Sequence, residues 1–368
     1  MIKSIKLFLK KEAVLVMSFI LAFISCFVVP PDKEYFKYID TATIIILFCL
    51  MLVISGLKEV GLFQHIGEAL LNKIKTERQL ILVLVLLCFF ASMFITNDVA
   101  LITFVPLGIL IINMANMNNS LCFTITLMTI SANLGSMLTP IGNPQNLYLY
   151  SISNFSVIKF ILIMLPYTII SAVLLLICIW LMYSKKNVNI DKLEDKKKLD
   201  KNSLIYYLIL FCLCILTVIG IISDIILLII IFIFILVKNR TLLLKIDYSL
   251  LLTFICFFVF VGNINRIAIF YEFIVNILNY NIRIISIFIS QIISNVPTAF
   301  LLAGFTEKWT ELIIGTNIGG LGTLIASMAS LISYKQVIIN YPNLKNKYLT
   351  VFTLLNIIFL AIFCILLI

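Results

Sequence analysis

The sequence predicts an all-α protein that crosses a membrane several times and consists of two halves related as an inverted repeat. Of its 368 residues, 62% are apolar and 12% are charged, against roughly 45–50% and about 25% in soluble domains. Apolar runs close to the length of about 20 residues that a membrane-spanning helix needs occur along the whole chain. Polar and helix-breaking residues interrupt some of these runs at matching positions in the two halves. This composition excludes ordinary soluble enzymes, nucleic-acid-binding proteins and disordered proteins.

The first half, residues 1–183, is expected to contain three uninterrupted spans and two interrupted stretches. A moderately polar segment at 59–77 is expected to lie along the interface as an amphipathic helix. In chain order the membrane elements are spans 12–30 and 40–57, a re-entrant hairpin at 79–112, a broken helix at 121–150 and a span at 157–183.

The second half, residues 203–368, follows a hydrophilic linker at 184–202 that carries seven lysines and four acidic residues. A second amphipathic segment is expected at 264–281. The membrane elements are spans 204–220, 222–238 and 247–262, a re-entrant hairpin at 283–306, a broken helix at 311–335 and a span at 347–368.

The basic residues indicate the orientation. If both hairpins enter and leave on one side, 21 of the 27 Lys and Arg residues fall on the same face. If either hairpin crossed the membrane once instead, every later segment would change sides and this sorting would be lost. By the positive-inside rule the basic face is cytoplasmic. We therefore expect a protein of the inner (plasma) membrane with a cytoplasmic N-terminus and an external C-terminus.

The interruptions of the two halves correspond to each other. Each hairpin centres on a hydroxyl residue followed by Asn, an Asn-X-Gly element comes later, and a small polar residue follows that Asn by ten positions. The pairs are Thr96-Asn97 with Ser294-Asn295, Asn133-Leu134-Gly135 with Asn317-Ile318-Gly319, and Asn143 with Ser327. Interrupted helices in matching positions are typical of secondary transporters with a site near the midplane. The alternative is close helix packing, which Gly, Ser and Thr also mediate in membranes.

Broken helices expose groups that bind ions. A helix that starts inside the membrane offers unpaired N–H groups to an anion, and the preceding helix end offers carbonyl oxygens to a cation. Asn, Ser and Thr side chains can serve either ion, while Gly and Pro let the backbone leave helical geometry. The candidate substrate- and ion-binding residues are Thr96, Asn97, Asp98, Asn133, Gly135, Thr139, Gly142, Asn143, Pro144, Asn146, Ser294, Asn295, Pro297, Thr298, Thr316, Asn317, Gly319, Gly320 and Thr323.

Asp98 is the acidic residue among these candidates. A carboxylate at membrane depth is costly and marks a functional site by default, so Asp98 is expected to hold a sodium ion or a proton. The alternative is a helix cap, in which its carboxylate accepts hydrogen bonds from the N–H groups of Ala100 or Leu101.

At these residues the sequence resembles the citrate-transporter-like branch of the ion transporter superfamily. This group includes sodium-coupled di- and tricarboxylate carriers, divalent anion–sodium symporters, arsenite permeases and a class of sodium/proton antiporters. The resemblance implies a homodimer, a transport domain that moves as an elevator, and hairpin tips that hold substrate and sodium. The sodium ligands that follow are Asn97, Asp98, Asn133, Asn295 and Asn317.

The hairpin tips differ from the Ser-Asn-Thr signature of the carboxylate branch. The first tip reads Thr96-Asn97-Asp98 and the second reads Ser294-Asn295-Val296. An Asp at the first tip is more similar to the arsenite and antiporter branches.

The predicted function is secondary active transport of a small anion, a di- or tricarboxylate or an inorganic oxyanion, coupled to sodium or protons. One alternative is a sodium/proton antiporter in which Asp98 exchanges the two cations. Another is an arsenite-type permease that works alone or with a separate ATPase. The sequence shows no nucleotide-binding glycine loop, no nucleophile–base set and no metal cluster, so we expect neither enzymatic activity nor a cofactor. The expected partners are the substrate anion, the coupling ion and the lipid bilayer, without nucleic acid.

Overall fold

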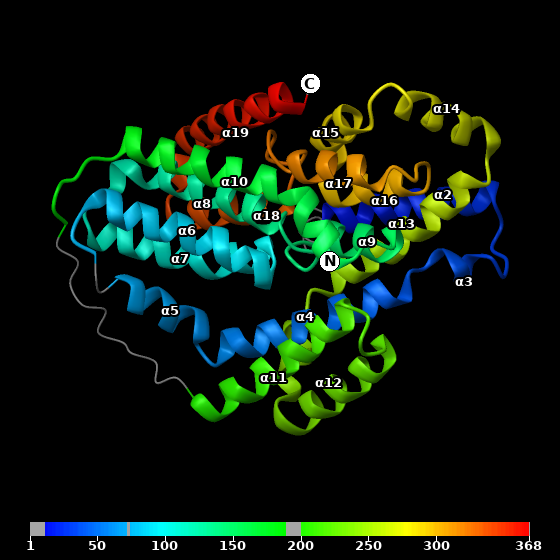
Figure 1. The fold of residues 1–368 in the computed structure, drawn as a ribbon, viewed down its shortest axis with the longest axis horizontal. Coiled ribbons are helices and arrows are strands. Elements are labelled where there is room, and N and C mark those ends of the chain that lie inside the picture. The colour runs from blue at the N-terminus through cyan, green and yellow to red at the C-terminus, as the bar shows by residue number, and fades with distance from the viewer. Residues whose placement is uncertain (1–11, 72–73, 189–199, 368) are drawn as a thin grey trace, which may run out of the picture.

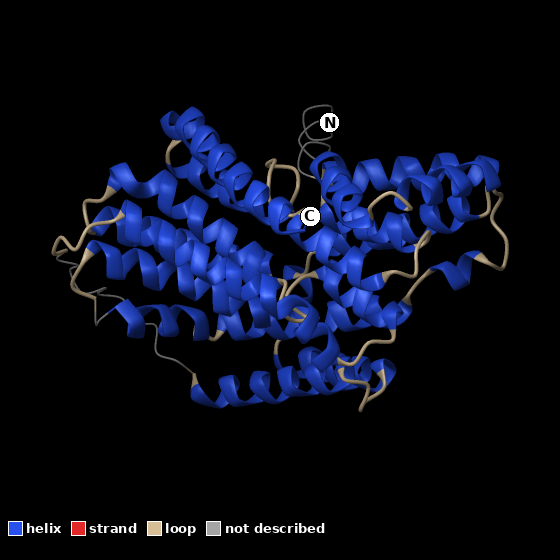
Figure 2. Ribbon diagram, turned by 45° about the horizontal axis from the view of Figure 1, so that its top comes forward, coloured by secondary structure: helices blue, strands red, loops and turns tan. Residues whose placement is uncertain are grey.

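The chain folds into helices and turns over residues 12–71, 74–188 and 200–367, the part that the computed structural model describes (Figure 2). The β-type pairing in this part is an isolated bridge between Thr76 and Asn187. The prediction of an all-α polytopic membrane protein is therefore confirmed. Most of the predicted linker, residues 189–199, lies outside the described residues.

In the first half a helix forms at every predicted membrane element. Each interrupted stretch consists of two helices. The helices are α2 (Ala13–Val28), α3 (Tyr35–Tyr38), α4 (Thr41–Glu59), α5 (Leu62–Leu71), α6 (Glu77–Ile95), α7 (Asn97–Met114), the short η1 (Asn118–Ser120), α8 (Leu121–Ser136), α9 (Pro144–Ser153) and α10 (Val157–Met182).

The second half repeats this pattern of paired helices at its interruptions. Its elements are α11 (Lys201–Val218), α12 (Asp224–Lys238), η2 (Arg240–Lys245), α13 (Tyr248–Asn265), α14 (Ala268–Leu278), α15 (Ile282–Ile293), α16 (Asn295–Ala303), α17 (Trp309–Ile318), α18 (Met328–Asn340), η3 (Pro342–Leu344) and α19 (Lys345–Leu367).

Seven of the described helices are long and apolar enough to cross a membrane: α4, α6, α7, α10, α11, α13 and α19. Helices α2 and α12, with 16 and 15 residues, are shorter than the predicted spans. At 1.5 Å per residue they reach about 24 and 22 Å, less than the roughly 30 Å of the hydrocarbon core. Helices α14 and α15 meet at a bend of 115° and would count as an eighth, broken span.

Side-chain caps define where many of these helices begin. Asp40 accepts a hydrogen bond from the N–H of Thr43 at the start of α4 (3.1 Å), and Asp247 accepts one from Leu250 at the start of α13 (3.1 Å). Each cap satisfies one of the N–H groups that the first turn leaves without a helical partner. The sequence therefore sets these helix starts locally.

Two sets of helices pack closely within the fold: α6, α7, α8 and α18, which we call the hairpin group, and α4, α11 and α12, which lie lower in Figure 1. Helices α6 and α7 pack on each other and on α8, and α7 also packs on α18. Helix α4 packs mainly on α11 and α12. Aromatic rings join α9, α13 and α16: the ring centroids of Tyr148 and Phe300 lie 4.2 Å apart, and those of Phe254 and Phe300 lie 4.6 Å apart.

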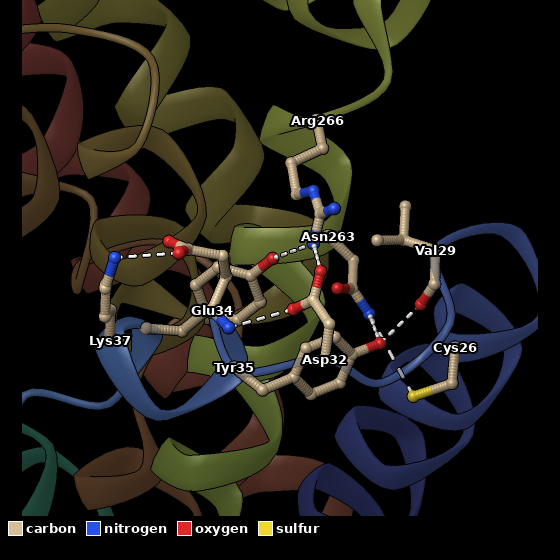
Figure 3. Close-up of polar contacts among 9 residues, drawn as sticks. Cys26, Val29, Asp32, Glu34, Tyr35, Lys37, Asn263 and Arg266 are labelled. Carbon is tan, nitrogen blue, oxygen red and sulfur yellow. Dashed lines mark hydrogen bonds and ion pairs between the residues drawn. The ribbon is translucent and has the colours of Figure 1, made fainter.

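Ion pairs join segments that the charge analysis assigns to the same side of the membrane. Arg266 pairs with Asp32 at 2.8 Å, and Lys245 pairs with Glu59 at 2.8 Å. Figure 3 shows the first pair beside Asn263, whose amide donates to the hydroxyl of Tyr35 (2.8 Å). The contacts of Arg266 and Asn263 tie the loop after α2 and the start of α3 to the end of α13, whereas Lys245 and Glu59 join η2 to α4.

Candidate functional site

Each predicted hairpin turns at a single residue with unusual backbone geometry. Thr96 separates α6 from α7 with φ 68° and ψ 149°, and Ser294 separates α15 from α16 with φ 79° and ψ 155°. Positive φ is rare for residues other than glycine, and such strain persists where the surrounding structure holds it. The two tips therefore have the same conformation, as their matching sequences predict.

The tips bind to two breaks in the helices that follow. The first break, residues 137–143, lies between α8 and α9, and the second break, residues 319–327, lies between α17 and α18. The N–H of Asn97 donates to the carbonyl oxygen of Gly142 (3.1 Å), and the N–H of Asn295 donates to that of Ala326 (2.9 Å). These carbonyls come directly before the positions matched from the sequence, Asn143 and Ser327.

Two further contacts repeat in the halves. Thr139 and Thr323 each lie six residues after the matched Asn. The hydroxyl of Thr139 donates to the carbonyl oxygen of Met93 (2.5 Å), and that of Thr323 donates to the carbonyl oxygen of Gln291 (3.1 Å). Each of these carbonyls lies three residues before its tip. A glycine of each half lies against a serine four residues before the tip. A Cβ added at Gly135 would lie 2.7 Å from the hydroxyl of Ser92, and one at Gly319 would lie 2.7 Å from that of Ser290.

A buried network of asparagines joins the two halves. The side-chain oxygen of Asn133 accepts hydrogen bonds from the amide of Asn97 and the hydroxyl of Ser327, both at 3.0 Å. The side-chain oxygen of Asn317 accepts one from the amide of Asn143 (3.0 Å), and the amide of Asn317 donates to Asn146 (2.6 Å). Each break thus contacts the matched Asn of the opposite half.

Other predicted residues build the backbone around this network. Asn143 caps α9 through the N–H of Asn146 (2.9 Å), and the amide of Asn146 donates to the carbonyl of Thr139 (3.1 Å). A Cβ at Gly142 would lie 2.0 Å from the carbonyl oxygen of Ser136, so the first break folds too tightly there for any side chain.

The predicted residues of the second half have mixed roles. A Cβ at Gly320 would lie 2.9 Å from the amide nitrogen of Asn295, and Pro297 lies in the first turn of α16. The hydroxyls of Thr298 and Thr316 donate within their own helices to Ser294 (2.8 Å) and Leu312 (2.7 Å). Thr298 and Thr316 therefore bond within their own helices here, and Gly320 lies at the contact between tip and break.

Asp98 lies apart from the asparagine network, at the edge of a cavity of about 250 Å³. We call this the hairpin-tip cavity. Thr96 and Pro144 also line it, and the opposite walls come from α4, the start of α13 and Ile332 of α18. The Asp98 side chain makes no hydrogen bond with any residue that the structure describes. The helix-cap alternative for Asp98 therefore has no support, and its carboxylate oxygens are available for a ligand.

The sequence comparison supports a transport function for this arrangement. Residues 5–308 match the family described as citrate transporter. The chain belongs to this citrate transporter family. An uncharacterized transporter of Methanocaldococcus jannaschii is 36% identical over 303 residues, 82% of either chain. The inner membrane protein YbiR of Escherichia coli is 30% identical over 321 residues, 85% of this chain and 84% of its own.

A more distant relative is named for the solute that it exports. The silicon efflux transporter LSI3 of Oryza sativa is 35% identical over 141 residues, 38% of this chain and 28% of its own. Membership of the citrate transporter family, together with the apolar helices, makes this chain a multi-pass membrane transporter and not an enzyme. The resemblance stated from the hairpins is thus confirmed.

Three polar residues at or near the site of this transporter were not among the candidates taken from the sequence. Gln291 binds the second break: its amide nitrogen donates to the carbonyls of Gly319 (3.1 Å) and Leu321 (2.9 Å), and its oxygen accepts from the N–H of Thr323 (2.8 Å). Gln145, at the start of α9, is buried with both amide atoms unpaired among the described residues. Lys58 lines the hairpin-tip cavity. A polar residue inside an apolar run is the signal that could have identified Gln291.

Proposed function

We propose that the protein is a secondary active transporter of a small oxyanion, coupled to sodium or protons through Asp98. The observation that carries this proposal is the asparagine network, which takes residues from both helix breaks and both halves. Secondary transporters place their substrate between such interrupted helices, near the midplane. The family described as citrate transporter supports an anionic substrate.

The charge of the site favours an inorganic oxyanion over a tricarboxylate. All side chains of the asparagine network are neutral, so they offer hydrogen bonds to oxygen atoms but no compensating positive charge. The carboxylate of Asp98 adds negative charge nearby, and a multiply charged anion would be repelled unless a cation came with it. The rice relative is named for the efflux of silicon, an inorganic solute.

The transport cycle that we propose is an elevator motion of the hairpin group against the group of α4, α11 and α12. The separate packing of the two groups supports it, as does the family resemblance. The proposal includes re-entrant hairpins, an inverted repeat, a homodimer, and a plasma-membrane location with the N-terminus inside. Sodium would bind the oxygen atoms near the tips, with Asp98 as the charged ligand.

Uptake into proteoliposomes tests this proposal. Vesicles containing the purified protein receive labelled arsenite, silicate, phosphate, sulfate, succinate or citrate under an inward sodium gradient, an inward proton gradient or neither. We expect one of the inorganic solutes to accumulate and one gradient to accelerate it. Accumulation of citrate or succinate alone would show that the substrate class is wrong. Equal uptake with and without gradients would contradict the coupling.

A second candidate is sodium/proton antiport, which the free carboxylate of Asp98 favours. In that case sodium added outside the vesicles changes the internal pH without any anion in the buffer. Dependence of transport on an added ATPase would instead support an arsenite-type permease that works as the channel of a pump.

A further inference from the structure

Four charged side chains line the hairpin-tip cavity, and two of them have partners. Lys245 bonds to Glu59 at 2.8 Å, and Asp247 caps α13. The side chains of Lys58 and Asp98 form no ion pair or hydrogen bond with any residue in the described ranges. The cavity therefore contains one unpaired charge of each sign.

Lys58 and Asp98 belong to different groups of helices. Lys58 lies in the last turn of α4, which packs mainly on α11 and α12, and Asp98 lies in the first turn of α7, which packs on α6, α8 and α18. Most of the remaining lining is aliphatic: Leu47, Leu50, Met51, Ile54, Val99, Ile102, Ile246, Leu250 and Ile332.

The physical setting favours contact between these two charges. Opposite charges attract more strongly where apolar walls lower the effective dielectric constant, and an unpaired carboxylate at membrane depth is costly. Lys58 extends from its helix on a flexible four-carbon stem. A movement of the α7 tip toward α4 would close the cavity and bring the two groups together.

We propose that Lys58 is a tethered counter-ion of Asp98. In the empty carrier the Lys58 ammonium pairs with the Asp98 carboxylate and closes the hairpin-tip cavity. The coupling cation takes the place of Lys58 at Asp98, and the cavity opens. Lys58 is thus a positioning residue that competes with the transported cation. The competition rests on the proposed function, whereas the pair itself requires only that α7 can reach α4.

The first experiment measures the competition. The melting temperature of the purified full chain is recorded against sodium chloride, with choline chloride holding the ionic strength constant, because a ligand of the folded state raises it. We expect Lys58→Gln to lower the half-saturating sodium concentration about tenfold, or about 1.4 kcal/mol. Lys58→Arg keeps the charge and the wild-type value. Asp98→Asn abolishes the shift.

Lys245→Gln is the matched control, because Lys245 lines the same cavity but already bonds to Glu59. It should leave the half-saturating sodium concentration unchanged. If Lys58→Gln behaves like Lys245→Gln while the wild type responds to sodium, Lys58 does not compete with the cation and the proposal is wrong.

The second experiment detects the pair without any cation. In sodium-free buffer the melting temperatures of Lys58→Gln, Asp98→Asn and the double variant form a cycle. We expect the double variant to have the same melting temperature as the Asp98→Asn single variant, because Lys58 has already lost its partner in that single variant. The effects of Lys245→Gln and Asp98→Asn should add. Additive effects in both cycles would overturn the pair. If no form responds to sodium, sodium coupling is wrong, and this cycle still decides whether the pair exists.

Discussion

Two regions of the molecule, the first half-site (Thr96 with residues 137–143) and the second half-site (Ser294 with residues 319–327), share one backbone construction but differ in their side chains. In both, a residue of positive φ forms the hairpin tip, the next Asn donates its N–H to the helix break, and a Thr of the break binds the hairpin arm. Contacts that recur in this way define what is needed to hold a broken helix against a hairpin.

The differences occur at equivalent positions relative to the tips and the matched asparagines. Asp98 of the first half corresponds to the buried Val296, and Met93 corresponds to Gln291. The fully buried Val85 and Leu127 correspond to Arg283 and Glu311, which form an ion pair between α15 and α17. The first half-site therefore carries the ionisable group beside a cavity, whereas the second carries extra contacts that fix its break.

The largest effect is expected at Asp98. If the first half-site performs the coupling, Asp98→Asn removes the charged cation ligand and reduces gradient-driven uptake about 100-fold, corresponding to loss of about 2.7 kcal/mol. The measurement is initial uptake into proteoliposomes with and without the gradient. Asp224→Asn, which changes an acid at the start of α12, is the control and should transport normally. Undiminished stimulation of the Asp98→Asn variant by the gradient would remove the functional difference between the half-sites.

The glycines test whether the two half-sites are packed equally tightly. A Cβ at Gly135 would lie 2.1 Å from the backbone oxygen of Phe89, which cannot rotate away. We expect Gly135→Ala to destabilise the protein by about 2–3 kcal/mol and Gly319→Ala by less, since a serine hydroxyl is its nearest neighbour.

Thermal unfolding in detergent measures both effects. The control is Gly108→Ala, whose nearest neighbour is the thioether of Met128 at 3.0 Å, a flexible group that can move. Equal melting temperatures for Gly135→Ala and Gly108→Ala would contradict the tight contact between α8 and α6.

A smaller effect is expected when two glutamines receive the same substitution. Gln291→Met places the residue of the first half-site into the second and leaves the backbone groups of the second break without partners, which costs about 1–3 kcal/mol. Gln145→Met removes a buried amide whose atoms are unpaired, so the protein should become more stable. Thermal unfolding of both variants checks the opposite signs. A loss of stability in both would mean that Gln145 also has a structural role.

The local features of the fold could be predicted from the sequence. Helix breakers inside apolar runs identified both hairpins, and the repeated hydroxyl-Asn pair identified the tip residues Thr96 and Ser294. Caps such as Asp40 also depend on residues only a few positions away. These signals are local because helix geometry is set within one or two turns.

The partners across the chain could not be predicted. The bond between Asn143 and Asn317 joins residues 174 positions apart, and nothing in either segment specifies the other. In the sequence Gln291 is simply a polar residue of an amphipathic helix. Its role becomes visible only in the fold, where its side chain bonds to the backbone of the second break. The sequence likewise could not show whether Asp98 caps α7, because a cap and a ligand need the same residue type and only the position of the side chain shows that it makes no cap hydrogen bond.

The smallest effect concerns the ion pair of Arg266 and Asp32, which lies outside both half-sites. Its contribution to the pH dependence of the melting temperature can be measured separately from theirs. The hydrogen bond from Arg266 lowers the pKa of the Asp32 carboxyl below its ordinary value of 3.8. The stabilisation is therefore complete above that value and is lost as the pH falls through the lowered pKa. We expect Asp32→Asn to leave the pH dependence of the melting temperature unchanged between about pH 5 and 8 and to flatten it below about pH 4. A change between pH 5 and 8 would contradict this assignment.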